Sequence, residues 1–166
     1  MSAAHATTDL CDAHGDAVRV IALPWRDLGG RMAFSGTVST VRAFEDNSRV
    51  REAVAEPGHG RVLLVAGGGS LRRAMLGDLL AAKAVENGWE GIVIDGVIRD
   101  SGVIAGLALG VKALGVCPRK TEKLGDGRRD VVVEIGGVAI APGQWLCADA
   151  DGVVVMDRQP GAALQP

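Results

Sequence analysis

The fold is decided by residues 61–100, which read RVLLVAGGGS LRRAMLGDLL AAKAVENGWE GIVIDGVIRD. Residues 61–66 are a continuous apolar run, which is typical of a strand buried on both faces of a sheet. Residues 78–87 then repeat small and apolar side chains at helical spacing, and Gly88 is a suitable stop for that helix. Residues 91–95 form a second apolar run. The order strand, helix, strand predicts parallel pairing through a right-handed crossover.

The same pattern extends to both sides of this stretch. Towards the C-terminus the sequence predicts a short helix from Arg99-Asp100 to Leu109, a strand at 111–116, a hairpin at 130–140 around Gly136-Gly137, and strands at 144–148 and 153–156. Towards the N-terminus it predicts a helix at 9–14, strands at 17–22 and 37–44, and a helix at 45–56. The predicted fold class is therefore α/β, with a parallel βα portion and a C-terminal hairpin-rich portion.

Composition sets the limits of this prediction. The chain has 166 residues, 48% of them hydrophobic but only 3% aromatic, so the core must be built from Val, Ile, Leu and Ala. Its 24 glycines, about twice the average usage, predict many tight turns. We expect a single domain over 1–166, with a core at about 8–157 and frayed ends at 1–7 and 158–166.

Charge and cysteine content exclude several classes of function. The formal net charge is −2, without a basic stripe, so a direct nucleic-acid partner is not expected. No apolar run reaches the length of a bilayer span, and the N-terminus lacks the pattern of a signal peptide. The three cysteines, Cys11, Cys117 and Cys147, show no CxxC spacing. We therefore expect a cytoplasmic protein with reduced thiols and no membrane partner.

Two polar segments are candidates for a functional site. Arg99-Asp100 follows the strand at 91–95, and ligands of open α/β sheets bind in the crevice at such strand ends. The segment Gly77 to Leu80 opens a helix, where free backbone N–H groups can hold a carboxylate or phosphate. Each acid has a simpler interpretation, since Asp78 and Asp100 could each merely stabilise a helix N-terminus. Together they predict a site for a small carboxylate and a divalent metal.

Other motifs point less clearly to chemistry. The glycines at 67–69 match neither a Walker loop nor GxGxxG, and are interpreted as a turn. The three histidines show no metal-ligand spacing. The acidic turn at 149–152 could bind a metal, but its Asp-Gly pair is more typical of a hairpin turn. Four lysines could in principle form a Schiff base, but none has an obviously apolar setting, so solvated side chains are expected for Lys83, Lys112, Lys120 and Lys123.

Several stretches, taken together and in order, resemble one family. They are Gly29-Gly30-Arg31, Phe44 to Asn47, Val65 to Ser70, Gly77-Asp78, Gly88 to Gly91, Gly96 to Asp100, and Asp149 to Val153. Over about residues 8–157 the chain is similar to the family of regulators of ribonuclease activity A and 4-hydroxy-4-methyl-2-oxoglutarate aldolases (RraA-like). The resemblance implies a β/β/α swivelling-type domain that assembles as a homotrimer or hexamer.

The resemblance also implies an activity and the residues that carry it. Aldolase members cleave 2-oxo acids with a divalent metal, Mg²⁺ or Mn²⁺, and decarboxylate oxaloacetate through the same pyruvate enolate. Carried over to this sequence, the backbone of Gly77, Asp78, Leu79 and Leu80 binds the pyruvate end of the substrate. Arg99 binds substrate and stabilises the enolate, Asp78 lies near the metal-bound waters that move the proton, and Asp100 is the protein ligand to the metal.

One position departs from the aldolase pattern and keeps a second hypothesis open. Aldolase members commonly carry Glu or Asp three residues after the metal aspartate, where this chain has Val103. Regulator members can lack the metal aspartate, which is present here as Asp100. The alternative function is a non-catalytic regulator of ribonuclease E-type RNA degradation that binds a ribonuclease or helicase, and a third possibility is a fold with neither role. Some members carry a demethylmenaquinone methyltransferase label, but no glycine motif for S-adenosylmethionine follows the first strand.

Overall fold

The computed structural model describes residues 5–161. Its helices are α1 (Thr7–His14), the 3-10 helix η1 (Gly15–Ala17), α2 (Ser48–Val54), α3 (Asp78–Glu86) and α4 (Ser101–Ile104). Its longer strands are β3 (Phe34–Arg42), β4 (Val62–Ala66), β5 (Gly91–Ile94), β7 (Gly110–Ala113), β12 (Trp145–Asp149) and β13 (Gly152–Met156). The shorter ones are β1 (Arg19–Val20), β2 (Arg26–Asp27), β6 (Val97–Ile98), β8 (Gly115–Val116), β9 (Arg128–Arg129), β10 (Val133–Ile135) and β11 (Val138–Ile140).

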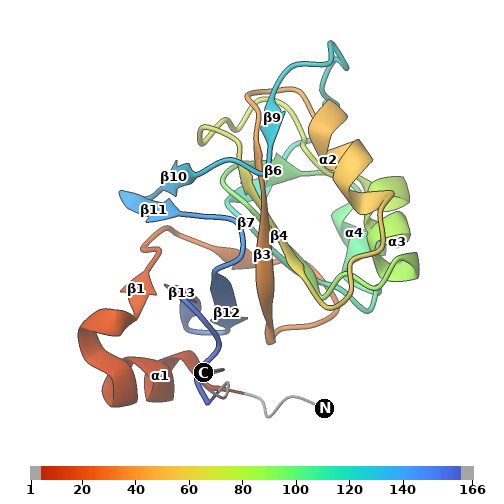
Figure 1. Ribbon diagram of the computed structural model, residues 1–166. Helices are drawn as coiled ribbons and strands as arrows, with labels where there is room; N and C mark the ends of the chain where they lie inside the picture. The colour runs from red at the N-terminus through yellow and green to blue at the C-terminus, as the bar shows by residue number, and fades with distance from the viewer. Residues whose placement is uncertain (1–4, 162–166) are drawn as a thin grey trace.

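One large sheet organises the molecule (Figure 1), with the strand order β1-β13-β12-β3-β4-β5-β7-β2 and β9 paired to β3. The strands β3, β4, β5 and β7 run parallel to one another, and β12 and β13 form an antiparallel hairpin beside β3. The strands β10 and β11 form a separate hairpin. These pairings confirm the predicted parallel βα portion and hairpin-rich portion.

The apolar run in β4 is buried because the sheet is covered on both faces. Leu63 and Val65 pack into a core shared with α2, α3 and α4, which lie on one face (Figure 1). Val62 and Leu64 point the other way, into a core shared with β10, β11, β12 and β13. All four side chains have no solvent exposure. Alternate residues of a strand face opposite sides, so only a strand covered twice can be apolar throughout.

The N-terminal segment is better ordered than the sequence indicates. In α1, Thr7 is buried, and its backbone N and its hydroxyl donate hydrogen bonds of 2.8 and 2.7 Å to the carboxylate of Asp149. Leu10 packs against Trp145 and Val154. The prediction of fraying at 1–7 is therefore wrong for the last of these residues, because a polar turn of the β12–β13 hairpin anchors them. Residues 1–4, and 162–166 of the predicted C-terminal tail, lie outside the described residues.

Two further predictions need correction. The helix predicted at 45–56 begins only at Ser48, because Glu45 has a φ of 52° and the carboxylate of Asp46 accepts the backbone N–H of Ser48. The strand predicted at 111–116 is split at Leu114, since β7 pairs with β5 whereas β8 pairs with β6. The carboxylate of Asp46 also accepts backbone N–H groups of Leu124 and Asp126, so both changes involve contacts between segments distant in sequence.

Lys112 on β7 is not the solvated lysine that the sequence predicts. Its side chain is 2% exposed, its Nζ lies 2.7 Å from Asp27 Oδ1, and it donates a hydrogen bond to the backbone carbonyl of Asp149. A buried ammonium is tolerated only with such partners. Paired in this way, it serves the packing of β7 against β2 and β12, and it is not a candidate nucleophile.

Residues 5–161 contain no helix long and apolar enough to cross a membrane. Within the same residues, Cys11, Cys117 and Cys147 form no disulfide bond.

Candidate active site

Three chain segments meet at the edge of the sheet where α3 begins. The segment around Ala74 pairs with β6 on one side and with Lys120 on the other. Its backbone is fixed by hydrogen bonds from Met75 N to Val97 O at 2.9 Å and from Arg99 N to Leu76 O at 2.9 Å. The loop before α3 and the loop after β6 are therefore held side by side, although more than twenty residues separate them in sequence.

This pairing brings the two predicted site segments together. Asp78 N, the first amide of α3, donates a 3.1 Å hydrogen bond to Asp100 Oδ2. Arg99 Nε lies 4.0 Å from the same oxygen, and both side chains are 39% exposed. A Cβ added to Gly77 would stand 3.1 Å from Asp100 Oδ2 and 3.3 Å from Arg99 Nε. The absence of a side chain at Gly77 thus lets the arginine and the aspartate approach the helix start.

The amides of α3 are partly engaged by carboxylates of the chain itself. Besides the bond from Asp78 N to Asp100, Leu79 N donates a 2.9 Å hydrogen bond to Asp78 Oδ1. Negative charge is favoured at a helix N-terminus, and here the two acids supply it. The backbone of Gly77 to Leu80 is therefore placed to bind a carboxylate, in competition with Asp78 and Asp100.

Asp100 adopts a conformation that few residue types tolerate. It has φ 56° and ψ 38°, in the left-handed region, at the N-cap of α4. Aspartate and asparagine enter this region more readily than other residues with a side chain. The turn directs its carboxylate back towards Gly77 and Asp78 rather than into a cap of its own helix, since its side chain makes no cap hydrogen bond.

The side chains at this site can bind a divalent cation only if water and substrate supply most of its ligands. Residues 5–161 contain no group of three or more His, Cys, Asp or Glu side chains that could hold a metal. Asp100 Oδ1 accepts no hydrogen bond from these residues, and Asp78 lies next to it. One carboxylate with several waters and substrate oxygens is an ordinary arrangement for Mg²⁺. The candidate metal ligand is therefore Asp100 alone.

A pocket of about 410 Å³ adjoins the arginine and the start of α3. The predicted residues Gly77, Asp78, Leu79, Leu80 and Arg99 line part of it. The pocket is also lined by residues that sequence reasoning did not assign to the site, namely Asn47, Arg51, Lys83, Lys120 and Lys123. Five basic side chains and one acid thus surround the pocket, which favours an anionic ligand with more than one carboxylate.

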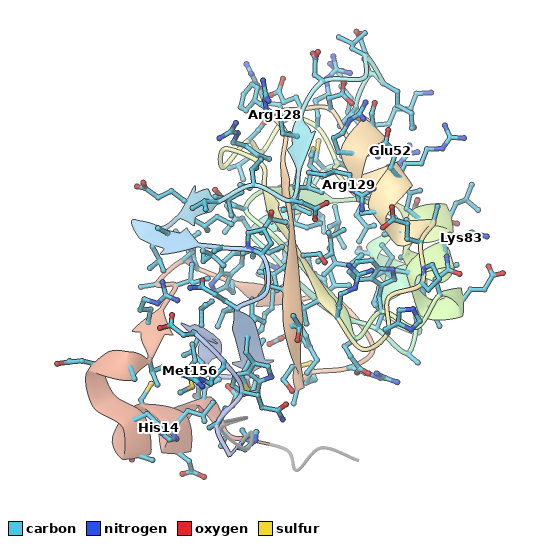
Figure 2. All side chains as sticks on the ribbon, viewed as in Figure 1. His14, Glu52, Lys83, Arg128, Arg129 and Met156 are labelled. Carbon is cyan, nitrogen blue, oxygen red and sulfur yellow. The ribbon has the colours of Figure 1, made fainter. Side chains whose placement is uncertain are left out.

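The added lysines come from separate elements. Lys83 projects from α3 away from the sheet (Figure 2), and Lys120 and Lys123 come from the loop after β8. As predicted, all three are solvent-accessible rather than buried, and so are not set up as Schiff-base nucleophiles. The sequence places them on solvated turns and gives no sign that they converge.

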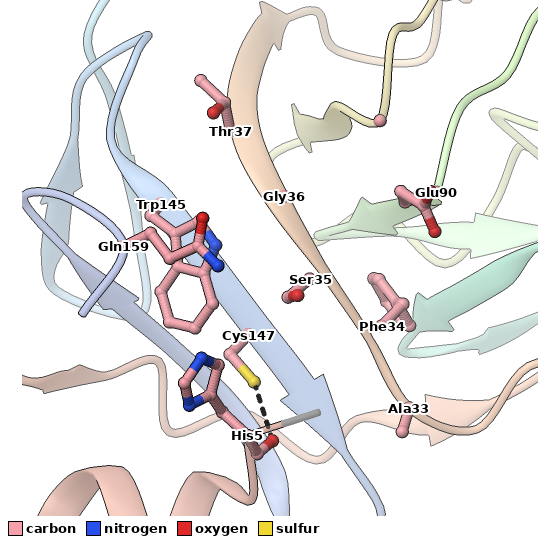
Figure 3. Close-up of a pocket in the computed structure, with 11 residues that line it drawn as sticks. His5, Ala33, Phe34, Ser35, Gly36, Thr37, Glu90, Trp145, Cys147 and Gln159 are labelled. Atoms are coloured by element: carbon pink, nitrogen blue, oxygen red, sulfur yellow. Dashed lines mark hydrogen bonds between the residues drawn. The ribbon is translucent and has the colours of Figure 1, made fainter. Parts of the chain in front are cut away.

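A second pocket, of about 350 Å³, is lined by residues of the paired strands β3 and β12 together with His5 and Gln159 (Figure 3). The ring of His5 stands edge-on to Trp145, with 5.5 Å between ring centroids, and Cys147 Sγ donates to the carbonyl of His5 at 3.3 Å. Burial, with a contribution from Asp149, raises the pKa of Cys147 to about 11. A protonated, buried thiol is not a nucleophile, so this pocket lacks the chemistry of the first.

The fold and the pocket together define a mixed α/β domain with a cationic site at the edge of its parallel strands. The chain belongs to the RraA-like family, because a family model described as Aldolase/RraA matches residues 7–155. This finding confirms the resemblance and the fold class inferred from the sequence.

Curated relatives agree with this assignment. A protein of Alkalilimnicola ehrlichii is 57% identical over 149 residues, which cover 90% of this chain and 92% of that protein. A protein of Pseudomonas paraeruginosa is 53% identical over 151 residues, which cover 91% of this chain and 93% of that protein. Both carry the name "Putative 4-hydroxy-4-methyl-2-oxoglutarate aldolase".

Two solved structures have nearly the same fold but different descriptions. One is described as an S-adenosylmethionine:2-dimethylmenaquinone methyltransferase from Geobacillus kaustophilus, with a TM-score of 0.93, 48% identity, and coverage of 97% of this chain and 100% of that one. The other is described as the RNA-processing inhibitor RraA from Thermus thermophilus, with a TM-score of 0.92, 40% identity, and coverage of 97% and 98%. The shared fold therefore does not by itself determine the activity.

Proposed function

We propose that this protein is a divalent-metal-dependent lyase that cleaves 4-hydroxy-4-methyl-2-oxoglutarate and similar 2-oxo acids to pyruvate, and that it also decarboxylates oxaloacetate. The observation that carries the proposal is the meeting of Arg99, Asp100 and the first amides of α3 beside one cationic pocket. The aldolase names of the relatives support the same class of reaction.

In this proposal, two regions of the pocket bind the two ends of the substrate. The backbone of Gly77 to Leu80 and the guanidinium of Arg99 receive the pyruvate end, since both offer directed N–H donors. The distal carboxylate lies towards Lys120 and Lys123, which also line the pocket. A substrate with two carboxylates binds to both regions, whereas pyruvate, with one carboxylate, binds to the first region only.

Bond cleavage requires stabilisation of an enolate on the pyruvate fragment. When the C3–C4 bond breaks, its electron pair stays with C3, and the negative charge spreads to the oxygen on C2. The guanidinium of Arg99 stabilises this oxygen with hydrogen bonds that strengthen as charge develops. In the aldol case a proton leaves the C4 hydroxyl and a proton returns to C3. Asp78 Oδ2 is the carboxylate oxygen available to carry it, because Oδ1 accepts the hydrogen bond from Leu79 N.

Asp100 would hold the metal in this proposal. A bound divalent cation supplies Lewis-acid polarisation of the 2-oxo group, which lowers the free energy of the enolate. Since Asp100 is the single protein ligand, binding of Mg²⁺ or Mn²⁺ is expected to be weak and readily reversed by chelation.

An assay of oxaloacetate and of a pyruvate aldol tests the activity directly. We expect pyruvate formation with Mg²⁺ or Mn²⁺, loss of activity after chelation, and recovery when the metal is returned. Heat-denatured protein with the same metal controls for the spontaneous decarboxylation of oxaloacetate. A rate that equals this control with every metal would refute the lyase proposal.

A second candidate function rests on two observations. The structure described as an RNA-processing inhibitor is 40% identical over nearly the whole chain, and Val103 stands 57% exposed where aldolases commonly carry an acid. In this case the chain would bind a ribonuclease or helicase without catalysis. Inhibition of a ribonuclease E-type enzyme by both the wild-type chain and Arg99→Lys, with no lyase activity in either, would favour this function.

We also propose that the chain is a homotrimer or a hexamer. Two exposed apolar side chains flank the candidate site, Leu79 at 80% exposure and Val103 at 57%, and burial between subunits would remove both from water. Light scattering at micromolar concentration is expected to give the mass of three or six chains. A stable monomer would contradict this prediction and would leave the pocket open on that side.

A further inference from the structure

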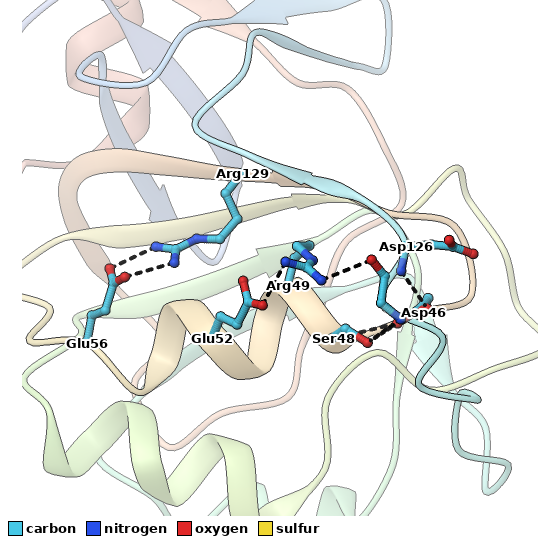
Figure 4. Close-up of polar contacts among 8 residues, drawn as sticks. Asp46, Ser48, Arg49, Glu52, Glu56, Asp126 and Arg129 are labelled. Atoms are coloured by element: carbon cyan, nitrogen blue, oxygen red, sulfur yellow. Dashed lines mark hydrogen bonds and ion pairs between the residues drawn. The ribbon is translucent and has the colours of Figure 1, made fainter.

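The loop that carries Lys120 and Lys123 has no regular structure of its own. Residues 121–127 belong to neither a helix nor a strand, and all but Thr121 are exposed. Such a loop places two lysines at a pocket only if other contacts fix its backbone. The backbone of Lys120 is held in part by its β-bridge with Ala74. The loop that follows it is fixed by contacts from one short segment, residues 46–49, which we call the 46–49 anchor (Figure 4).

Asp46 is the centre of the anchor. Its side chain is 2% exposed, and Oδ2 accepts hydrogen bonds from Leu124 N at 2.8 Å and Asp126 N at 3.1 Å. Oδ1 accepts two more, from the backbone N and the hydroxyl of Ser48. Burial alone would raise the pKa of Asp46, but these hydrogen bonds outweigh it and lower the pKa to about 2. The carboxylate is therefore charged under ordinary conditions and uses both oxygens to hold the loop.

Asn47 adds a second attachment at the start of the loop. Its Oδ1 accepts a 2.8 Å hydrogen bond from the hydroxyl of Thr121, and its backbone N donates to the same hydroxyl at 3.3 Å. Both residues are buried. Arg49 Nη2 further donates to the carbonyl of Gly125 at 2.9 Å (Figure 4). Lys123 thus lies between two fixed points, Thr121 and Leu124, and Lys120 directly precedes the first.

We propose that Asp46 is a positioning residue that sets the specificity of the pocket for ligands with a distal carboxylate, by holding the loop that presents Lys120 and Lys123. The inference rests on the proposed function, because it takes the distal carboxylate to be bound on the lysine side. It assigns no contact with substrate to Asp46 itself. The residues proposed for the pyruvate end, Gly77 to Leu80 and Arg99, lie on other elements and make no hydrogen bond to Asp46.

A comparison of two ligands separates positioning from mere stability. 2-Oxoglutarate carries both the 2-oxo acid end and a distal carboxylate, whereas pyruvate carries only the first. Dissociation constants for both are measured by calorimetry with saturating Mg²⁺, on the wild-type chain and on Asp46→Asn. We expect the Kd of 2-oxoglutarate to rise about tenfold in the variant, as for loss of one charge-assisted contact, and the Kd of pyruvate to change less than about twofold.

Two further variants complete the experiment. Thr121→Val breaks the Asn47 attachment with a side chain of similar shape, so it tests the anchor if Asp46→Asn fails to fold, and it should show the same selective loss. Asp126→Asn is the matched control: it removes a carboxylate from the same loop, but only the backbone N of Asp126 contacts Asp46. Its dissociation constants should equal those of the wild type.

The possible results either support or contradict the role of Asp46. The proposal would be overturned if Asp46→Asn and Thr121→Val raised the Kd values of 2-oxoglutarate and pyruvate equally, or left both Kd values unchanged. It would also be overturned if the wild-type chain bound 2-oxoglutarate no more tightly than pyruvate. Oxaloacetate turnover of the wild type is measured separately. Selective loss of 2-oxoglutarate binding without any turnover would refute the lyase function and leave the role of Asp46 intact.

Discussion

Replacing Arg99 by lysine is expected to lower kcat/KM for oxaloacetate by roughly 30- to 1,000-fold, which corresponds to about 2–4 kcal/mol of transition-state stabilisation. Lysine keeps the charge but loses the planar donor geometry that can hold a carboxylate and a developing enolate together. The guanidinium of Arg99 makes no side-chain hydrogen bond within residues 5–161, so its donors are available to a ligand. Steady-state kinetics on the purified variant measure this loss.

Thermal stability distinguishes this role from a structural one. The Arg99 side chain is 39% exposed and lies 4.0 Å from Asp100, and so exposed a contact contributes little to folding. The Tm of Arg99→Lys should therefore equal that of the wild type. Arg72→Lys is a suitable control, because Arg72 is 74% exposed and pairs with Glu45 outside the pocket. Normal turnover in Arg99→Lys together with a large fall in Tm would identify a structural arginine. Normal turnover with an unchanged Tm would identify a solvated side chain without a role in the reaction.

The parts of the fold that the sequence predicts are those with a local cause. The run at 62–66 is apolar at every position because the sheet is covered on both faces, and this pattern alone indicates a central strand. The helix predicted at 78–87 appears as α3, and Gly88 follows it with a φ of 79°. The turn at Gly136-Gly137 joins β10 and β11 as expected. The spacing of apolar residues, the glycine that ends a helix and the residue types of a turn all depend only on residues close together in the sequence.

The parts that the sequence does not predict depend on distant contacts. Lys112 is buried because Asp27 lies beside it, eighty-five positions earlier in the chain. Asp46 delays the start of α2 because its carboxylate also binds the loop at 124–126. A lysine or an aspartate in an otherwise ordinary stretch gives no indication of such a partner.

The same division applies to the candidate site. The sequence predicts that Arg99-Asp100 and the start of α3 lie together because both follow parallel strands, and the structure joins them through the hydrogen bond from Asp78 N to Asp100. Lys120 and Lys123 reach the pocket only through an irregular loop, whose path no periodic pattern encodes. Sequence reasoning therefore finds the residues at the two strand ends and misses the cations that converge on the pocket, Arg51 from α2, Lys83 from α3, and Lys120 and Lys123 from the loop.

Removing the carboxylate of Asp100 is expected to abolish lyase activity, but the two obvious substitutions should differ in stability. Both Asp100→Asn and Asp100→Ala remove the one charged ligand proposed for the metal, so turnover should fall by at least about a hundredfold. Asparagine accepts the left-handed conformation of this residue and can still accept the hydrogen bond from Asp78 N. Alanine can do neither without cost, about 1 kcal/mol or more for the backbone alone.

The pair of variants therefore separates chemistry from folding. The Tm of Asp100→Asn should stay near that of the wild type, whereas the backbone cost in Asp100→Ala should lower Tm by roughly 2–4 °C for a domain of this size. Activity is measured at a fixed Mg²⁺ concentration, with chelated wild type as the reference for metal-free protein. If Asp100→Asn keeps wild-type turnover, or if the chelated wild type does, the metal is not part of the reaction. If Asp100→Asn is inactive and stable while the chelated wild type is equally inactive, the carboxylate and the metal act at the same step, and the left-handed turn at Asp100 is the backbone feature that directs this carboxylate towards the start of α3.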